Sequence, residues 1–478
     1  METGELLVAG NFIGGACDSS VAKSPVLSPW DGRTVGSIAE GGWEHMDAAL
    51  SAAAEAFPAW ARTPRFERSS LLRRAAALIR AHADLLVETA VAEIGKPKSL
   101  ASGEVSRCAL TFDLAASLLD SLVHEAPSAE IEPRGSGHWA RLERFPRGVF
   151  LAITPYNWPY NLAAHKVAPA LAAGNTVVLK PSGSSALCGA VLARVLHAAG
   201  FPTGVVNSVH CEPPVAERAA QDDRTKMVSF TGSEEVGYHI RGVVADKPVS
   251  LELGGDATAI VMPDADMDFA ASRCALGGFG YAGQVCISVQ HVLVHESVFH
   301  PMKGLLTQAT ENCPSGDPGL EATVCGPLIH ASAADRVEAW ISEAVQDGAE
   351  LLAGGIRERN LIRPTLLTGV PSISKIGCEE VFGPVVTLER FSDLDQAVER
   401  VNSSRFGLQA GVFTSDIRTA TRLFRDLEVG SLVVGDYPTL RLDNMPYGGT
   451  KRSGMGREGV RNAYEEATEP RVMLVRPD

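Results

Sequence analysis

The sequence predicts an α/β protein with two parallel-sheet units, and three features of the chain support this. Between residues 148 and 255, short apolar runs alternate with segments of helical periodicity, which is the pattern of parallel strands joined by crossover helices. Residues 258–435 repeat the alternation. The length of 478 residues, of which 45% are hydrophobic, allows a large buried core, and it suggests about three structural units.

The N-terminal part predicts short strands followed by helices. In chain order we expect strands at Leu6–Ala9, Asn11–Gly14 and Thr34–Ile38, and helices from Asp47 onward, from Phe66 to Ile94 and from Ala101 to Val123. Arg144 to Pro146 follow a glycine-rich turn at Gly135–Gly137 and indicate the return strand of a hairpin.

The first parallel-sheet unit is expected to contain five strands. They are Val149–Thr154, Thr176–Leu179, Gly204–Val209, Met227–Thr231 and Val249–Leu253. The helices between them are expected at Asn161–Ala173, at Ser185–Ala199, at Pro214–Asp222 and after Gly232. At the end of the chain, Arg471–Val475 predicts a further apolar strand.

Composition excludes several classes of function. The formal net charge of −14 argues against a general surface for nucleic acid or anionic membranes. No apolar run reaches the ~18 residues of a membrane span, and residues 1–10 lack the basic and apolar regions of a signal peptide. The nine cysteines are scattered without a C-x-x-C pair, which predicts neither a metal site nor a disulfide framework. We therefore expect a cytoplasmic protein.

The segment Gly277–Ser288 places Cys286 among small and apolar residues, just before the β-rich run Val289–Val294. Its glycines allow close approach of the backbone, and N–H groups near such a turn can hold a negative oxygen. Cys286 is therefore a candidate nucleophile, although a single cysteine is more often a small buried apolar residue.

Three further segments place polar residues beside turns: Leu251–Gly255, Thr154–Pro159 and Glu379–Pro384. Burial of Glu252 between two leucines would raise the pKa of its carboxyl towards that of a general base. Asn157 lies on a proline-bracketed loop. The alternatives are a buried ion pair for Glu252 and a helix cap for Asn157.

Taken in chain order, these four segments resemble those of the aldehyde dehydrogenase superfamily. The resemblance extends from about Ala9 to the C-terminus. It implies two Rossmann-like parallel-sheet units with an active site between them, plus a β-arm for assembly as a homodimer or homotetramer. The expected parts are a dinucleotide-binding domain (residues 1–122 and 147–253), a catalytic domain (254–445), and an arm with a C-terminal tail (123–146 and 446–478).

The resemblance also implies the chemistry. Oxidation of an aldehyde needs a thiolate to add to the carbonyl carbon, an oxyanion site, a hydride acceptor and a base to activate the water that hydrolyses the thioester. By this resemblance Cys286 is the nucleophile, Asn157 and the Cys286 N–H form the oxyanion site, and Glu252 is the base.

For the cofactor, the resemblance implies NAD or NADP, although no G-x-G-x-x-G stands in its usual place. The expected contacts are Lys180 at the adenosine ribose, Gly232 and Ser233 at the pyrophosphate, Glu380 and Phe382 at the nicotinamide end, and Thr154, Ser182 and Gly183 nearby. Many NAD-using relatives have a glutamate at the position of Gly183, where it repels a 2′-phosphate. Its absence predicts that NADP is tolerated, although no arginine in this loop binds the phosphate.

The substrate is expected to be a small, short polar or anionic aldehyde. Tyr156, Trp158 and Tyr281 are candidate tunnel walls, and Arg107 and Arg441 could together bind an anionic group. The plainer alternatives are core aromatics and structural ion pairs, with Glu104 the nearest acidic residue to Arg107. Alternative functions are a phosphono-aldehyde dehydrogenase, a relative that transfers the acyl group to CoA, and a catalytically silent structural protein.

Overall fold

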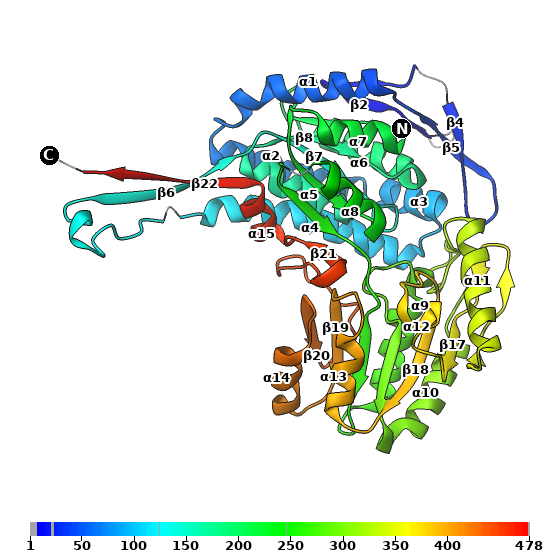
Figure 1. The fold of residues 1–478 in the computed structure, drawn as a ribbon. Helices are drawn as coiled ribbons and strands as arrows, with labels where there is room; N and C mark the ends of the chain where they lie inside the picture. Colours follow the sequence, from blue (N-terminus) through cyan, green and yellow to red (C-terminus); the bar gives the residue numbers. More distant parts are fainter. Residues whose placement is uncertain (1–6, 21–22, 124, 245, 477–478) are drawn as a thin grey trace.

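The computed structural model describes residues 7–20, 23–123, 125–244 and 246–476, and shows two α/β lobes with a projecting arm (Figure 1). The predicted fold class is confirmed. Leu6, the first residue of the first expected strand, lies outside the described residues.

The first lobe contains an eight-stranded sheet in which five neighbouring strands, from β11 to β9, pair in parallel. The spatial order is β21 (Gly454–Met455), β11 (Val249–Glu252), β10 (Thr225–Thr231), β7 (Val149–Ile153), β8 (Thr176–Lys180), β9 (Val206–Ser208), β2 (Asn11–Ile13) and β3 (Ala16–Asp18). A three-stranded sheet, β1 (Leu7–Ala9), β5 (Thr34–Ala39) and β4 (Lys23–Leu27), packs on α6 (Ala186–Ala198).

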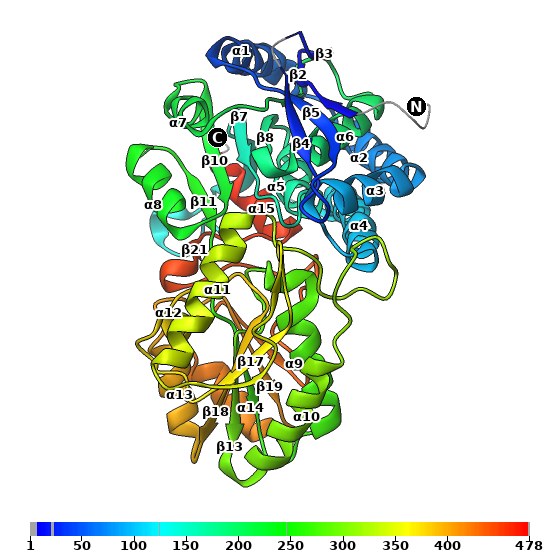
Figure 2. The same cartoon turned by 90° about the vertical axis from the view of Figure 1, so that its right-hand side faces the viewer.

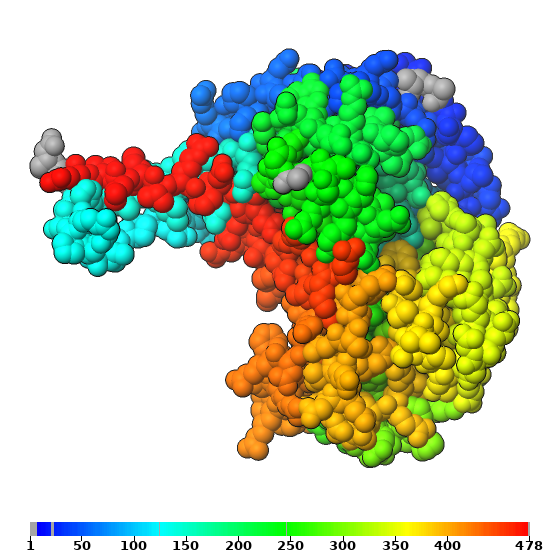
Figure 3. Space-filling model, in the orientation of Figure 1, coloured from blue at the N-terminus to red at the C-terminus, as the bar shows by residue number. Residues whose placement is uncertain are grey.

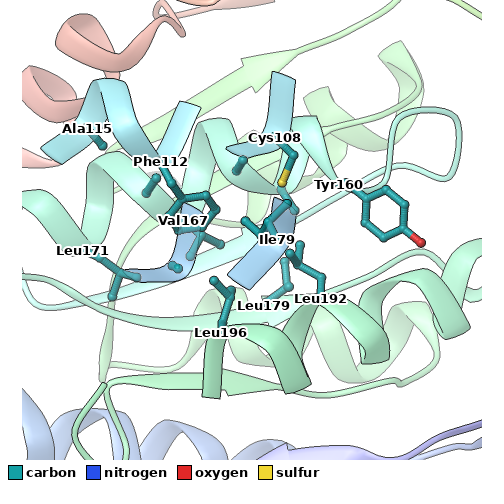
Figure 4. Close-up of a cluster of buried hydrophobic side chains, with 14 of the residues drawn as sticks. Ile79, Cys108, Phe112, Ala115, Tyr160, Val167, Leu171, Leu179, Leu192 and Leu196 are labelled. Carbon is teal, nitrogen blue, oxygen red and sulfur yellow. The ribbon is translucent and has the colours of Figure 1, made fainter. Parts of the chain in front are cut away.

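Helices cover both faces of this sheet because its strands are apolar on both sides. Phe150 and Ala152 of β7 belong to a large cluster with residues of α2 (Arg65–Ala81), α3 (Ala83–Ile94), α4 (Lys98–Ser121), α5 (Asn161–Ala173) and α6 (Ala186–Ala198). Figure 4 shows part of this cluster, including Phe112, Val167 and Leu196. The alternate residues Val149, Leu151 and Ile153 pack on the other face with α1 (Trp43–Trp60), α7 (Pro213–Gln221) and α8 (Glu234–Val243).

The second lobe repeats the design with seven strands. Their order is β14 (Glu350–Ala353), β17 (Thr365–Thr368), β18 (Val385–Phe391), β13 (His291–His295), β12 (Thr258–Val261), β19 (Gln409–Phe413) and β20 (Ser431–Val434); all adjacent pairs are parallel except β14 with β17. Its helices are α9 (Met267–Phe279), α10 (Phe299–Glu311), α11 (Ala331–Gln346), α12 (Lys375–Cys378), α13 (Leu394–Asn402) and α14 (Ile417–Asp426). Two short strands, β15 (Arg357–Glu358) and β16 (Leu361–Ile362), form a separate hairpin.

The arm extends one prediction. The strand β6 (Trp139–Pro146) does return past the segment before it, since Leu142 forms an antiparallel bridge with Glu125, but its main partner is β22 (Thr468–Val475), with which it pairs antiparallel along eight residues. The two strands stand clear of both lobes (Figure 3). Sequence periodicity could not find this pairing because the partner strand lies more than 300 residues away.

Two further differences concern helices and the tail. The helix expected from Phe66 to Ile94 is two helices, because His82 departs from helical geometry (φ −110°, ψ 22°) between α2 and α3. Only the last part of the C-terminal tail belongs to the arm. Before it, β21 joins the first sheet and α15 (Val460–Glu466) packs on α5. None of the helices in the described part of the chain combines the length and apolar composition of a bilayer-spanning segment.

Candidate active site

A cavity of about 270 Å³ lies between the two lobes, and Cys286 is part of its wall. The first lobe contributes Leu100 and Arg107 from α4, together with Trp158 and the start of α5. The second lobe contributes the end of α9 and the loop that contains Arg441. The chain therefore brings the expected nucleophile to an internal space at the junction of the lobes.

The loop before Cys286 has an unusual backbone. Tyr281, Ala282 and Gly283 all have left-handed φ values, of 53°, 54° and 68°. Such a conformation costs free energy at non-glycine residues and is kept only where the surroundings enforce it. At Gly283 a β-carbon would lie 2.1 Å from the carbonyl oxygen of Gly383, so only glycine is possible there.

Cys286 is partly buried, and its Sγ lies 3.2 Å from the hydroxyl oxygen of Tyr447. Burial raises the pKa of the thiol to about 12, although the Tyr447 hydroxyl acts in the opposite direction. The backbone N–H of Cys286 has no acceptor among the described residues. The thiol is therefore protonated in this state, beside an N–H that is free to bind an oxyanion.

Glu252 ends β11 and is 3% exposed. Neither carboxyl oxygen has a hydrogen-bond partner among the described residues. Burial raises the pKa of this carboxyl well above its usual range, and the charge of Glu458 adds to the shift. A β-carbon at Gly255 would lie 2.8 Å from the carbonyl oxygen of Cys286, so the segment after Glu252 passes directly against the nucleophile loop. Glu252 is thus unpaired, unlike the ion-paired carboxylate considered as its alternative.

Asn157 is buried, and its Nδ2 donates to the carbonyl oxygen of Gln284, 2.9 Å away, in the nucleophile loop. One N–H of that amide remains for another acceptor. The backbone carbonyl oxygen of Asn157 accepts a hydrogen bond from Lys96 Nζ at 2.9 Å. Asn157 does not cap α5, because Glu104 accepts from the backbone N–H groups of Tyr160 and Asn161 at the start of that helix.

The expected dinucleotide residues lie at the ends of first-lobe strands and at the lobe junction. Lys180 ends β8, beside Thr154, whose N–H donates to the Lys180 carbonyl. Ser182 follows as the N-cap of a 3-10 turn, η2 (Gly183–Ser185), which Gly183 begins. Gly232 and Ser233 precede α8, and the Ser233 hydroxyl caps that helix.

Among the expected dinucleotide-binding residues, Glu380 is predicted to lie at the nicotinamide end. Its carboxylate accepts a hydrogen bond from the N–H of Gly255 at 3.1 Å. Burial raises the pKa of the Glu380 carboxyl to about 7. A β-carbon at Gly254 would lie 2.2 Å from this carboxylate, so a larger residue there would push the Glu380 side chain away. Phe382 lies edge-on to Tyr156, with 6.1 Å between ring centroids.

The five expected substrate residues separate into two groups. Arg107, Trp158 and Arg441 line the cavity. Tyr281 is wrong as a tunnel wall: it is fully buried, and its hydroxyl donates to the carbonyl of Ile94 in the core. Tyr156 is also absent from the wall, because its hydroxyl donates to Gln284 Oε1 and its ring faces Phe382.

Each arginine has a carboxylate partner, as the ion-pair alternative expected, but the partners are not those that the sequence indicated. Arg107 donates through Nε and Nη2 to both oxygens of Asp443, at 2.9 and 2.7 Å. The proposed partner Glu104 binds Lys96 instead. Arg441 donates to Glu458 at 2.9 Å, and Glu458 also accepts from Lys166 at 3.0 Å.

Sequence reasoning missed four residues that shape the site: Gln284, Tyr447, Asp443 and Glu458. Gln284 directly precedes Val285-Cys286 in the chain, so its position was a usable signal. The other three lie in residues 443–458, which carry no local pattern of their own; the fold brings this segment back between the lobes.

Comparison with known proteins agrees with this geometry. The model of the aldehyde dehydrogenase family matches residues 17–473. A curated relative, 3-sulfolactaldehyde dehydrogenase of Priestia aryabhattai, is 37% identical over 98% of this chain and 98% of its own. Aldehyde dehydrogenase 21 of Physcomitrella patens, solved with the product succinate, has a TM-score of 0.96 at 35% identity and covers 99% of both chains.

A third match is the NADP-dependent glyceraldehyde-3-phosphate dehydrogenase of Bacillus halodurans C-125, solved with NADP, with a TM-score of 0.95 at 33% identity, covering 98% of this chain and 99% of that one. The chain belongs to the aldehyde dehydrogenase family. It is an oxidoreductase of this class, as the sequence predicted, and the expectation of NADP or NAD agrees with these relatives.

Proposed function

We propose that this aldehyde dehydrogenase oxidises a short anionic aldehyde to its carboxylic acid, with NADP or NAD as hydride acceptor and with hydrolysis of a thioester on Cys286. The observation that carries the substrate class is an excess of positive charge at the cavity wall. The arrangement of Cys286, Glu252 and Asn157 around one loop supports the roles that the family resemblance implies.

The charge excess comes from the group around Arg441. Arg441 and Lys166 share one carboxylate, Glu458, so two cations face one anion. Glu252 does not compensate, because its raised pKa keeps it neutral. The Nε of Arg441 is buried without a hydrogen-bond partner among the described residues, so a substrate anion would satisfy a donor that the protein leaves free.

Arg107 contributes less. Asp443 neutralises it through a bidentate pair and also accepts from His165 at 2.9 Å. Burial lowers the pKa of His165 to about 4, so this imidazole is neutral near pH 7. The Arg107 group therefore has no charge excess, and we assign anion binding chiefly to Arg441.

The cavity supports a short substrate. The Arg441 guanidinium stacks over the Tyr447 ring, 3.8 Å from its centroid, and the Tyr447 hydroxyl lies 3.2 Å from Cys286 Sγ. One tyrosine side chain thus separates the anion-binding donor from the nucleophile. By their names, the Priestia relative acts on 3-sulfolactaldehyde and the Physcomitrella structure contains succinate, and both are short anions.

In the proposed reaction, the Cys286 thiol first loses its proton to solvent, and the thiolate then adds to the aldehyde carbon. The resulting oxyanion accepts from the free N–H of Asn157 and the N–H of Cys286. The bound dinucleotide supplies a nicotinamide that accepts the hydride. Glu252 is neutral at rest and acts after it has lost its own proton to solvent. Its carboxylate, which the raised pKa makes a stronger base, then removes a proton from the water that attacks the thioester carbon, and Cys286 leaves as the thiolate.

The residues present fit a dinucleotide. Lys180, a buried cation without a partner among the described residues, would contact the adenosine ribose. The N-terminus of α8, with Gly232 and Ser233, would hold the pyrophosphate. Glu380 would bind the nicotinamide ribose hydroxyls beside Phe382, and Thr154, Ser182 and Gly183 would complete the groove.

The alternatives have less support. Transfer of the acyl group to CoA does not need a buried base beside the thioester, whereas Glu252 is present and unpaired. A structural protein on this fold would not need an unpaired carboxyl and an unpaired amide N–H around a cavity that contains a cysteine.

The test is a panel of succinic semialdehyde, a phosphono-aldehyde, lactaldehyde and glycolaldehyde, assayed with both cofactors. We expect the anionic aldehydes to give the higher kcat/KM. Arg441→Met should raise KM for the anionic members by roughly 10- to 100-fold, the effect of a hydrogen bond to a charged group, and should leave lactaldehyde almost unchanged. A wild-type preference for neutral aldehydes that survives in Arg441→Met would refute the substrate class.

We further propose that the chain assembles as a homodimer or homotetramer through its arm, in a reducing, cytoplasmic compartment. The β22 strand exposes Val472 and Leu474, and the edge strand β20 exposes Val434. Unpaired strand edges of this kind favour pairing with another chain. Val472→Asp with Leu474→Asp should lower the mass measured by light scattering; an unchanged mass would show that the arm does not mediate assembly.

A further inference from the structure

We infer that His330, which the second lobe brings onto the Gly183 loop, binds the 2′-phosphate of NADP together with Lys180, so that the enzyme prefers NADP. The inference rests on the proposed use of a nicotinamide dinucleotide and deepens it by naming the discriminating residue. The sequence provided no basic group in residues 181–185 for this phosphate.

The Gly183 loop is open. Around the position of a β-carbon on Gly183, no atom of the described residues lies within 4 Å. The Ser182 hydroxyl is used within the loop, where it accepts from the N–H of Ser184 at 3.3 Å. The place where a carboxylate would repel a phosphate is therefore empty space next to a fixed turn.

His330 reaches this loop from a distant part of the chain. Its Nε2 lies 2.9 Å from Ser184 Oγ, a contact across 146 residues. His330 directly precedes α11, which rises to the first lobe at the junction (Figure 2). Its ring is exposed, and Nδ1 has no partner among the described residues, so it can turn to an anion in the groove.

The start of α11 adds a partial positive charge beside the His330 imidazole, whose pKa burial lowers, so that the ring acts as a neutral hydrogen-bonding group. The helix has 16 residues and no acidic residue in its first turn. The N–H groups of Ala331 and Ser332 have no acceptor among the described residues, and such groups give the helix start a partial positive charge.

Lys180 is the independent observation that points to a ligand. It is 9% exposed, and it makes no hydrogen bond or ion pair through its side chain with the described residues. Burial lowers the pKa of the ammonium, and the field of exposed Glu212 opposes that effect. An unpaired buried cation is costly unless a ligand anion completes it.

These groups together favour a dianion over a hydroxyl. NAD presents only a ribose 2′-hydroxyl to this loop, whereas NADP presents a phosphate to an ammonium, an imidazole and a helix start. Glu212 is the competing group: if its carboxylate accepted from the ribose hydroxyl, the same loop would favour NAD.

The experiment measures binding by calorimetry, with 2′,5′-ADP and 5′-ADP as probes of the adenosine end alone. The wild type should bind 2′,5′-ADP more tightly. His330→Ala should weaken the binding of 2′,5′-ADP by about 10-fold, the effect of one charge-assisted hydrogen bond, and should leave the affinity for 5′-ADP unchanged. His330→Lys should restore most of the lost affinity for 2′,5′-ADP. His300→Ala, which removes an exposed histidine on α10, is the matched control and should alter neither probe.

Equal affinity of wild type and His330→Ala for 2′,5′-ADP would overturn the inference, as would an equal loss for both probes or a wild-type preference for 5′-ADP. Because no aldehyde is present, these results are independent of the proposed substrate. Loss of aldehyde oxidation in an enzyme that still prefers 2′,5′-ADP would count against the proposed function alone.

Discussion

The reacting groups and the wall of the cavity satisfy their polar atoms in opposite ways. Cys286 and Glu252 are kept neutral by burial, and the Glu252 carboxyl has no hydrogen-bond partner among the described residues. A few side chains away, Arg107, Asp443, Lys166 and Glu458 are charged and paired. The difference shows that the groups proposed to react are held without charged partners, whereas the charged groups of the wall are fixed in ion pairs.

Among the reacting groups, the largest effect is expected for Cys286→Ala. Because no other thiol lines the cavity in the described part of the chain, turnover should fall by at least about 1,000-fold. Binding of NADP, measured by calorimetry, should persist. Substantial dehydrogenase activity in this variant would remove the nucleophile from Cys286.

Glu252→Gln separates the two chemical stages. The variant should keep the first-turnover burst of NADPH, and steady-state turnover should fall by about 100- to 1,000-fold because only hydrolysis needs the base. Stopped-flow absorbance at 340 nm measures both. A proportional loss of burst and steady state would mean that Glu252 acts earlier, for example on the thiol.

The raised pKa of Cys286 predicts a pH dependence. Since that pKa is about 12, the thiolate fraction in the free enzyme increases about tenfold for each pH unit below it, so alkylation of Cys286 by iodoacetamide should become about 100-fold faster from pH 7 to pH 9. Peptide mass spectrometry follows the reaction. A rate that is flat over this range would show that the thiolate already exists near neutral pH.

Substitution of Arg107, which is paired with Asp443 in the cavity wall, should have a different effect from substitution of Arg441. Arg107→Met leaves the buried Asp443 without its bidentate partner, which should lower the free energy of unfolding by ~1–3 kcal/mol in urea titrations. KM should increase by a similar factor for succinic semialdehyde and lactaldehyde. A loss confined to succinic semialdehyde would assign anion binding to Arg107 as well.

The smallest expected effect concerns the cofactor loop. Gly183→Glu has room for its side chain and should shift the ratio of kcat/KM values towards NAD by roughly 1–3 kcal/mol, the size of a hydrogen bond gained with one cofactor and a repulsion added with the other. Gly183→Ala, which adds no charge, is the control. An unchanged ratio in Gly183→Glu would place the ribose away from this loop.

Most of the fold could be predicted from the sequence because local periodicity determines it. The helix Asn161–Ala173 and the strands of the first sheet follow directly from apolar patterns, as predicted. The pairing of β6 with β22 could not be predicted, since an edge strand of the arm has no local signal for a partner so distant in sequence.

The candidate site was predictable where a residue stands in a local motif. Cys286, Glu252 and Asn157 stand in such motifs, and the structure brings them to one loop. Tyr281 was misassigned because an aromatic residue near a nucleophile can face the core or the cavity, and only the left-handed backbone at this position decides between them. The partners Asp443 and Glu458 depend on tertiary contacts alone.

The most direct test of the central claim is the mass of the enzyme during turnover. Glu252→Gln, mixed with succinic semialdehyde and NADP and quenched in acid, should carry a succinyl adduct on Cys286, found by intact mass and peptide mapping. The account predicts one adduct per chain that accumulates at the rate of the NADPH burst. A burst of NADPH without an adduct on Cys286 would contradict it.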